Sequence, residues 1–360
     1  SIIFIYEAVA KLAHVFVEVG AGKDASLELS AALLSLVLAG GTFYIAISLS
    51  RFRRSSFLLP RFREFLSDFG PAIAMLAMTI VAVMAVNMHA VPLDALKAPE
   101  EFGPTTPRSW AIDLLAIPMW VRFAAIGPAL LVTVLVYLDQ NITARIVNSP
   151  DHRLHKGEAY HLDLGLVGIL MGACSLFGLP WLVAATVRSL NHVRSLATME
   201  PVVKPNGERH EQVVHVRENR LTGLTIHLML GFSLLLLPLL AKIPMAVLYG
   251  LFLFMGVVSM AGNQFFERLS LWLKDPGLYP TTHYIRRVKR ARIHLFTLIQ
   301  LVCLSVLWIV KVSAIAILFP IVIALMVPVR MLAGRFFTPQ ELAALDADEE
   351  PEDEETDWSS

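Results

Sequence analysis

Apolar runs of membrane-spanning length recur along the whole of this 360-residue chain. A helix needs about 20 consecutive apolar residues to cross the hydrocarbon core of a bilayer. None of the runs alternates apolar and polar residues with the period of two that a membrane strand shows, which argues against strands. The pattern predicts an all-α polytopic membrane protein. Six runs reach spanning length unaided: Leu29–Ser50, Phe69–Val86, Ile117–Leu138, Leu221–Ala241, Ile243–Asn263 and Val312–Val329.

Composition supports this prediction, because hydrophobic residues make up 56% of the chain and charged residues only 17%, which excludes a soluble globular protein. With the weaker runs included, ten segments are expected. They lie near residues 1–18, 29–50, 69–88, 114–138, 162–177, 180–197, 221–241, 243–262, 294–311 and 313–334. Gly178 and Pro180 interrupt the run that holds the fifth and sixth segments, so we expect a full helix, a break and a half-helix over about 182–197.

Basic residues crowd two loops, between Arg51 and Arg63 and between Arg268 and Arg292. The positive-inside rule makes both loops cytoplasmic and puts residues 19–28 and 89–113 outside. Residues 341–360 hold ten acidic residues and no basic ones, which predicts a disordered acidic tail on the cytoplasmic side. The chain begins at Ser1 within an apolar segment, and we expect it to be the carboxy-terminal part of a longer protein.

Two ionisable residues lie where hydrocarbon makes charge costly. Asp139 ends one apolar run and Arg188 follows the interrupted one. A charge near the bilayer centre costs about 2.5 to 3.5 kcal/mol on insertion scales, so such residues indicate an ion or substrate pathway. The sequence therefore indicates transport.

The expected half-helix suits an anion. The first N–H groups of a helix have no intrahelical partner and carry the positive end of the macrodipole, so the amides near Val183, Ala184 and Ala185 can receive an anion. Thr186 adds a hydroxyl, and Arg188 adds a planar, permanently charged fork suited to two oxygens. The alternative is a simple kink with Arg188 reaching toward water.

Asp139 and Thr143 are four residues apart and share one helix face. Together they can hold a sodium ion with help from substrate oxygens, or the carboxylate can carry a proton or pair with Arg188. The alternative is that Asp139 only caps a helix end at the interface. No nucleophile with its base, cofactor loop or metal-ligand cluster occurs, so neither an enzyme nor a cofactor is expected.

Several motifs, in order along the chain, together resemble the bicarbonate transporter family, which includes anion exchangers and sodium-coupled members. The resemblance runs from the first residue to about Asp348. Its motifs are Ser1–Lys11, Phe69–Pro71, Asp139–Thr143, His155–Leu164, Leu179–Trp181, Thr186–Ser189 and His294–Thr297.

The resemblance implies fourteen segments in two inverted repeats of seven, divided into a core (transport) domain and a gate (dimerisation) domain. This chain would hold about ten of the fourteen segments. Residues 1–90 and 243–335 would then be gate helices, 114–241 core helices, and 341–360 the acidic tail. Because only one of the two facing half-helices would be present, we expect the chain alone not to transport.

The resemblance further implies secondary bicarbonate transport by an elevator-like alternating-access mechanism. Aspartate at 139 resembles the sodium-coupled members, whereas arginine at 188 resembles the chloride/bicarbonate exchangers, which have glutamate at 139. A fixed guanidinium supplies the charge that sodium would bring, which favours exchange. Sodium-coupled bicarbonate or carbonate cotransport is the alternative, and a non-transporting structural membrane module is the third hypothesis.

Other partners are implied in the same way. Lys11 and Lys311 match the lysines that stilbene disulfonate inhibitors approach, although an interfacial ion pair and a lysine reaching for water would explain them equally well. Leu345–Glu349 resembles an acidic motif proposed to contact carbonic anhydrase, for which an unbound tail is the alternative. We expect a homodimer in the lipid bilayer of the plasma membrane, with no nucleic-acid partner.

Overall fold

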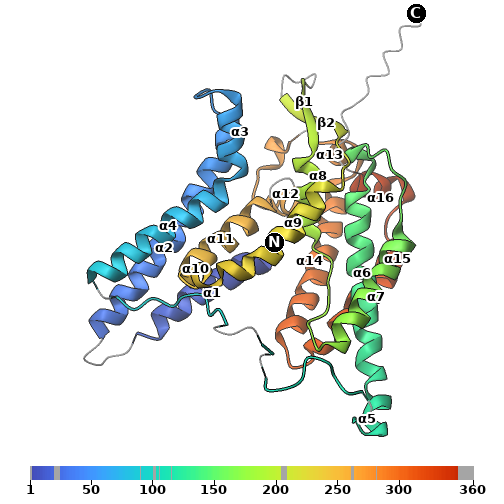
Figure 1. Ribbon diagram of the computed structural model, residues 1–360. Coiled ribbons are helices and arrows are strands. Elements are labelled where there is room, and N and C mark those ends of the chain that lie inside the picture. Colours follow the sequence, from blue (N-terminus) through green and yellow to red (C-terminus); the bar gives the residue numbers. More distant parts are fainter. Residues whose placement is uncertain are drawn as a thin grey trace, which may run out of the picture. The chain divides into compact units, whose positions relative to one another are not determined.

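The computed structural model describes residues 2–19, 25–89, 91–99, 103–104, 106–114, 116–203, 209–260, 263–280 and 282–347 (Figure 1). The chain divides into two compact units. The first unit comprises Ser1–Phe102 and Thr222–Glu267, and the second comprises Gly103–Leu221 and Arg268–Ser360.

Among the described residues, six helices are long and apolar enough to cross a membrane. Two shorter apolar helices, Tyr160–Leu176 and Met245–Val258, accompany them. A helix lies in each of the ten segments expected from the sequence, which confirms a helical polytopic membrane protein. The six long spans are Ala25–Arg51, Gly70–Met88, Met119–Val147, Leu221–Leu240, Arg290–Val312 and Ala316–Ala333.

The first unit is a helical bundle in which α2 packs against both α4 and α11, and α1 packs against α11. Small residues allow close approach: α2 buries Ala39 and Thr42, and a Cβ on Gly250 of α11 would overlap the carbonyl oxygen of Ala39. Its elements are α1 (Ile2–Val17), α2 (Ala25–Arg51), η1 (Phe52–Arg54), α3 (Pro60–Asp68), α4 (Gly70–His89), α9 (Leu221–Phe232), η3 (Ser233–Leu236), α10 (Leu237–Leu240) and α11 (Met245–Val258).

In the second unit α6 contacts α7, α8 and α15, while α14 packs along α15. Its elements are α5 (Met119–Ala124), α6 (Ile126–Val147), η2 (Pro150–His152), α7 (Tyr160–Leu176), α8 (Thr186–Ser195), β1 (Ala197–Val203), β2 (Arg209–Val216), η4 (Pro276–Leu278), α13 (His283–Arg287), α14 (Arg290–Val312), η5 (Ala316–Leu318), α15 (Phe319–Ala333) and α16 (Pro339–Asp346), while α12 (Gln264–Ser270) crosses the boundary between the units.

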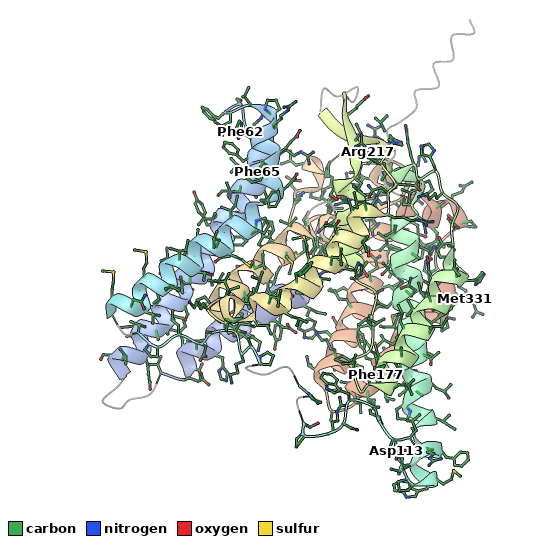
Figure 2. All side chains as sticks on the ribbon, viewed as in Figure 1. Phe62, Phe65, Asp113, Phe177, Arg217 and Met331 are labelled. Atoms are coloured by element: carbon green, nitrogen blue, oxygen red, sulfur yellow. The ribbon has the colours of Figure 1, made fainter. Side chains whose placement is uncertain are left out.

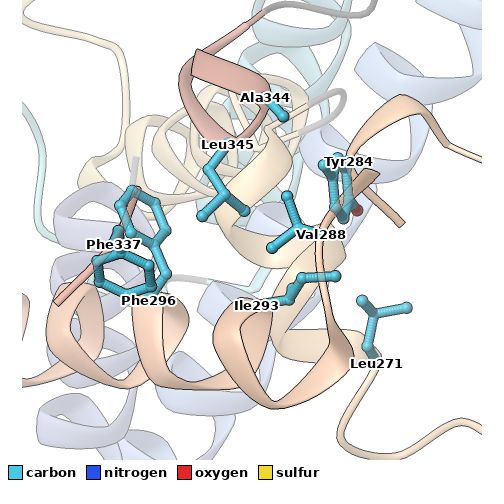
Figure 3. Packing of buried hydrophobic residues seen from close by; sticks show 8 residues of the cluster. All are labelled: Leu271, Tyr284, Val288, Ile293, Phe296, Phe337, Ala344 and Leu345. Atoms are coloured by element: carbon cyan, nitrogen blue, oxygen red, sulfur yellow. The ribbon is translucent and has the colours of Figure 1, made fainter. Parts of the chain in front are cut away.

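A cluster of buried side chains fixes α16 to the start of α14 (Figure 3). Its members are Leu271, Tyr284, Val288, Ile293, Phe296, Phe337, Ala344 and Leu345. Arg268, only 4% exposed, donates to the Leu345 carbonyl oxygen at 2.9 Å, and its guanidinium lies 5.2 Å from the centre of the Phe296 ring. Thr338 and Glu341 cap the first turn of α16 reciprocally.

Two sequence expectations were wrong in part. The acidic tail was expected to be disordered from residue 341, but residues 341–346 belong to α16 because Ala344 and Leu345 are apolar and become buried. Residues 348–360 lie outside the described residues. Strands were not expected, yet β1 and β2 form an antiparallel hairpin in the connection after α8. That hairpin lies outside the apolar runs on which the expectation was based.

Candidate functional site

The turn after α7 sets the direction of the segment that follows it. The amide of Leu179 donates to the Cys174 carbonyl at 2.8 Å, and the amide of Gly178 donates to that of Ser175 at 3.1 Å. This pair of bonds is a Schellman motif, which places its C′ residue in the left-handed region. Gly178 has φ +59° and occupies that position without the steric cost of a Cβ. Phe177 immediately precedes it (Figure 2).

Residues 179–185 belong to no helix or strand, and α8 begins only at Thr186. The prediction of a half-helix from Leu182 was therefore wrong by one helical turn, and Val183, Ala184 and Ala185 do not form its first turn. Pro180 disfavours helix in the residue before it, and the helix then begins after Ala185 without a side-chain cap. The first helical bond runs from the Ser189 amide to the Ala185 carbonyl at 2.8 Å. The unsatisfied amides are thus those of Thr186, Val187 and Arg188.

Two contacts join α6 to this break. The hydroxyl oxygens of Thr143 and Thr186 lie 2.6 Å apart, and Thr143 is only 6% exposed. One turn earlier on α6, the Asp139 carboxylate accepts a hydrogen bond from the backbone N–H of Ala184. The structure thus brings together four residues that the sequence analysis selected from two separate segments.

Arg188 and Val183 do not take part in those contacts. Val183 is 60% exposed, and the Arg188 side chain is also exposed. In the part of the chain that the structure describes, the guanidinium has no hydrogen bond and no ion pair with Asp139. Arg188 lies in the first turn of α8, where its donors remain available to a ligand.

The two lysines expected at an inhibitor site lie in different units. Lys11 is exposed on α1. Lys311 lies in the last turn of α14, with its ammonium 5.8 Å from the centre of the Trp308 ring. Their role stays a prediction. No cluster of three or more His, Cys, Asp or Glu side chains able to hold a metal ion occurs within the described ranges.

The sequence analysis missed a polar junction that includes the β1–β2 hairpin and Glu218, which follow α8 in the chain. Glu218 accepts hydrogen bonds from the backbone amides of His155 and Lys156 and forms an ion pair with the Lys156 ammonium at 3.8 Å. The rings of His155 and His215 are joined by a hydrogen bond of 3.2 Å between Nε2 and Nδ1. The junction therefore links the connection after α6 to the hairpin after α8. No periodicity marks these polar residues in the sequence.

Arg108 was also missed. It lies in the loop before α5, and its guanidinium reaches the turn after α7. An open hollow of about 700 Å³ lies at this contact. It is lined by Thr106, Arg108, Ser175, Gly178, Leu179, Pro180 and Trp181. One arginine in a polar loop carries no sequence signal that would assign it to that turn.

Comparison with known proteins identifies the family. The model of the HCO3- transporter integral membrane domain matches residues 20–350. Anion exchange protein 2 of Oryctolagus cuniculus and that of Homo sapiens are each 42% identical over 325 residues, which cover 88% of this chain and 26% of the relative. The Band 3 anion transport protein of Homo sapiens is 39% identical over 367 residues, which cover 97% of this chain and 40% of the relative. The chain thus spans between about a quarter and two fifths of the length of these relatives. It belongs to the bicarbonate transporter family, a family of membrane transporters and not of enzymes, as the sequence predicted.

Proposed function

We propose that the protein moves bicarbonate across a membrane in exchange for chloride, by elevator-like alternating access between a core and a gate domain. The observation that carries the proposal is the double contact of α6 with the break before α8, through Thr143–Thr186 and Asp139–Ala184. It holds the start of α8, with its free amides, against α6, and the exposed Arg188 lies in the first turn of that helix. The anion-exchanging relatives support the choice of substrates.

Physical chemistry gives each group a role. The free amides of α8 and its macrodipole attract an anion, and the Arg188 fork binds two oxygens of bicarbonate. The Asp139 carboxylate disfavours a second anion and offers a charge partner or a proton site. The Thr143–Thr186 pair is neutral and keeps the two segments in register. The fourteen-segment inverted repeat, the gate and core domains and the homodimer are parts of the same proposal.

The experiment expresses the protein from its complete reading frame and follows intracellular pH recovery. Recovery should persist when sodium is replaced by a bulky organic cation, and it should require chloride on the opposite side. Arg188→Ala should slow exchange more than tenfold, because a charge-assisted hydrogen bond contributes about 1.5 to 3 kcal/mol. Arg194→Ala, an exposed arginine in the last turn of the same helix, is the matched control and should leave exchange unchanged.

Sodium-coupled cotransport is the second candidate, because the Asp139 carboxylate lies one turn from the hydroxyls of Thr143 and Thr186 and oxygen ligands suit a hard cation. Under this candidate, sodium removal stops transport with Arg188 intact, and Thr143→Ala weakens the apparent sodium affinity. Complete absence of flux with normal membrane expression would favour the third candidate, a structural membrane module.

A further inference from the structure

Arg108 connects two parts of the second unit that are far apart in sequence. Its Nη1 donates to the carbonyl oxygens of Ser109 at 3.1 Å and Phe177 at 3.3 Å, and its Nη2 donates to that of Gly178 at 3.0 Å. The backbone of the same loop adds a bond from the Ile112 amide to the Leu176 carbonyl at 2.9 Å. The loop before α5 is therefore bound to the end of α7 through three consecutive carbonyls, those of residues 176–178.

Two of these carbonyls, those of Leu176 and Phe177, belong to the helix end that lacks donors. The last four C=O groups of a helix have no intrahelical partner, and the Schellman bonds at this end of α7 reach only those of Cys174 and Ser175. A guanidinium is an effective cap here, because it brings several fixed donors and a positive charge to the negative end of the macrodipole. Ile112 and Arg108 together satisfy what the turn itself leaves open.

Gly178 is adapted to the same contact. Besides its positive φ, a Cβ at this residue would lie 2.7 Å from Nη2 and 2.8 Å from Cζ of Arg108. The guanidinium thus packs directly on the backbone of the turn, and a Cβ at residue 178 would displace it. The turn and the arginine fit each other.

We propose that Arg108 is a positioning residue for transport: it fixes the exit direction of the chain from α7, and thereby the register of Ala184 and Thr186 against α6. This inference rests on the proposed function. Gly178 precedes Ala184 by six residues, and the intervening segment has no helical or strand bonds of its own. Its position is therefore set by its two ends, the Arg108 turn and the Asp139 and Thr143 contacts.

The test compares Arg108→Ala, Arg108→Lys and Arg108→Gln with wild type in the protein expressed from its complete reading frame. At equal surface expression, Arg108→Ala should raise the KM for bicarbonate severalfold, because the bonds that hold the turn are lost and the binding-competent arrangement is less populated. Arg108→Lys retains the charge without the planar fork and should recover part of the affinity. Arg122→Gln is the control, since Arg122 is an exposed arginine of the same unit whose Nε donates to the Ile117 carbonyl instead. A wild-type KM in Arg108→Ala would overturn the proposal.

A double-mutant cycle tests the contact itself. Gly178→Ala should impair transport about as much as Arg108→Ala or more, because its Cβ displaces the guanidinium from the turn and the positive φ is strained. The same change should cost less in the Arg108→Ala background, where the obstruction is gone and only the strain of the positive φ remains. Strict additivity of the two changes would contradict a direct contact.

A measurement that does not require transport separates this proposal from the proposed function. A cysteine at the exposed Val183, in a protein with Cys174 and Cys303 replaced by alanine, can be labelled with a membrane-impermeant thiol reagent. Arg108→Ala should change the labelling rate severalfold and Arg122→Gln should not. Unchanged labelling refutes positioning by Arg108 even in a protein that transports bicarbonate. Changed labelling without bicarbonate flux in wild type would uphold the positioning role while refuting the proposed substrate.

Discussion

The hydroxyls of Thr143 and Thr186 form one hydrogen bond at the point where the site is assembled. Replacing either threonine by valine leaves the other hydroxyl without its partner in a nearly buried place, which typically costs about 1 to 3 kcal/mol. Thermal unfolding of detergent-purified protein should therefore show a lower midpoint for Thr143→Val and for Thr186→Val.

The double variant provides the decisive comparison. With both hydroxyls removed and the shape conserved, the loss should be smaller than the sum of the two single losses. Thr133→Val on the same helix is the control, because Thr133 is exposed and donates only to the carbonyl of Ala129. Equal losses for Thr133→Val and Thr143→Val would show that the interhelical bond contributes nothing.

At the scale of single residues, the sequence predicted the α6 side of the contact with the break before α8. Asp139 and Thr143 were selected because charge is costly in hydrocarbon and because a four-residue spacing shares a face, and the structure places both against the break. The sequence did not predict Arg108, because a hydrogen bond to main-chain carbonyls about seventy residues away depends on tertiary structure and leaves no local pattern.

Among the elements, the junction that holds the hairpin beside η2 should be sensitive to acid. Desolvation acts to raise the pKa of Glu218, but the amide hydrogen bonds from Lys156 and His155 and the nearby positive charge outweigh it, so the pKa lies below the usual 4.5. A lowered pKa stabilises the folded state above pH 4.5, and this contribution is lost as the pH falls through the folded-state value.

The unfolding midpoint of wild type should therefore fall more steeply below pH 4.5 than that of Glu218→Gln, which has no charge to lose. At pH 7 the glutamine variant should be the less stable of the two. Midpoints measured from pH 7 to pH 3.5 check both expectations. Parallel curves for the two proteins would show that the Glu218 charge does not stabilise the junction.

The position of α16 leads to a second prediction about an element. Leu345 is 1% exposed within the cluster around α14, so Leu345→Ala should lower stability by about 2 to 5 kcal/mol. Gln340→Ala, an exposed position of the same helix, should have little effect. Thermal unfolding of both variants provides the comparison. A small effect of Leu345→Ala would mean that α16 is not docked in solution.

The same burial bears on the proposed carbonic anhydrase contact. The motif Leu345–Glu349 was expected to be an accessible tail, but its leucine is buried and the carboxylate of Asp346 is paired with Arg330. A partner that binds every residue of this motif would have to displace α16 from the cluster around α14. Composition alone suggested a uniform acidic tail, since it does not show that two apolar residues of a short capped helix become buried.

At the scale of the whole molecule, the sequence predicted where helices form, because hydrocarbon leaves the backbone few alternatives to helix. A helix lies in each of the ten predicted segments, and six of the described helices are long and apolar enough to cross a membrane. The start of α8 and the β1–β2 hairpin could not, because they depend on turn chemistry and on polar contacts outside the apolar runs. The boundary at Thr186 follows from Pro180, Gly178 and the contact with α6 together.

A prediction about the whole molecule concerns these 360 residues expressed alone. Facing half-helices are expected to form the site in the proposed fold, and the chain spans between 26% and 40% of the length of its relatives. Liposomes that contain only residues 1–360 should show no bicarbonate or chloride flux above that of protein-free liposomes, while protein from the complete reading frame should exchange the two anions. Robust flux from the 360 residues alone would contradict the inverted-repeat proposal.

The bond between Thr143 and Thr186 is electrically neutral, and this has a consequence for how such a site diversifies. A joint made of two hydroxyls does not weaken when the carboxylate at 139 is lengthened, protonated or neutralised, or when the cation at 188 is removed. Charges around it can therefore be exchanged one at a time while this bond still joins the two segments. Coupling to a different counter-ion would then require new charged side chains around an unchanged contact between α6 and the start of α8.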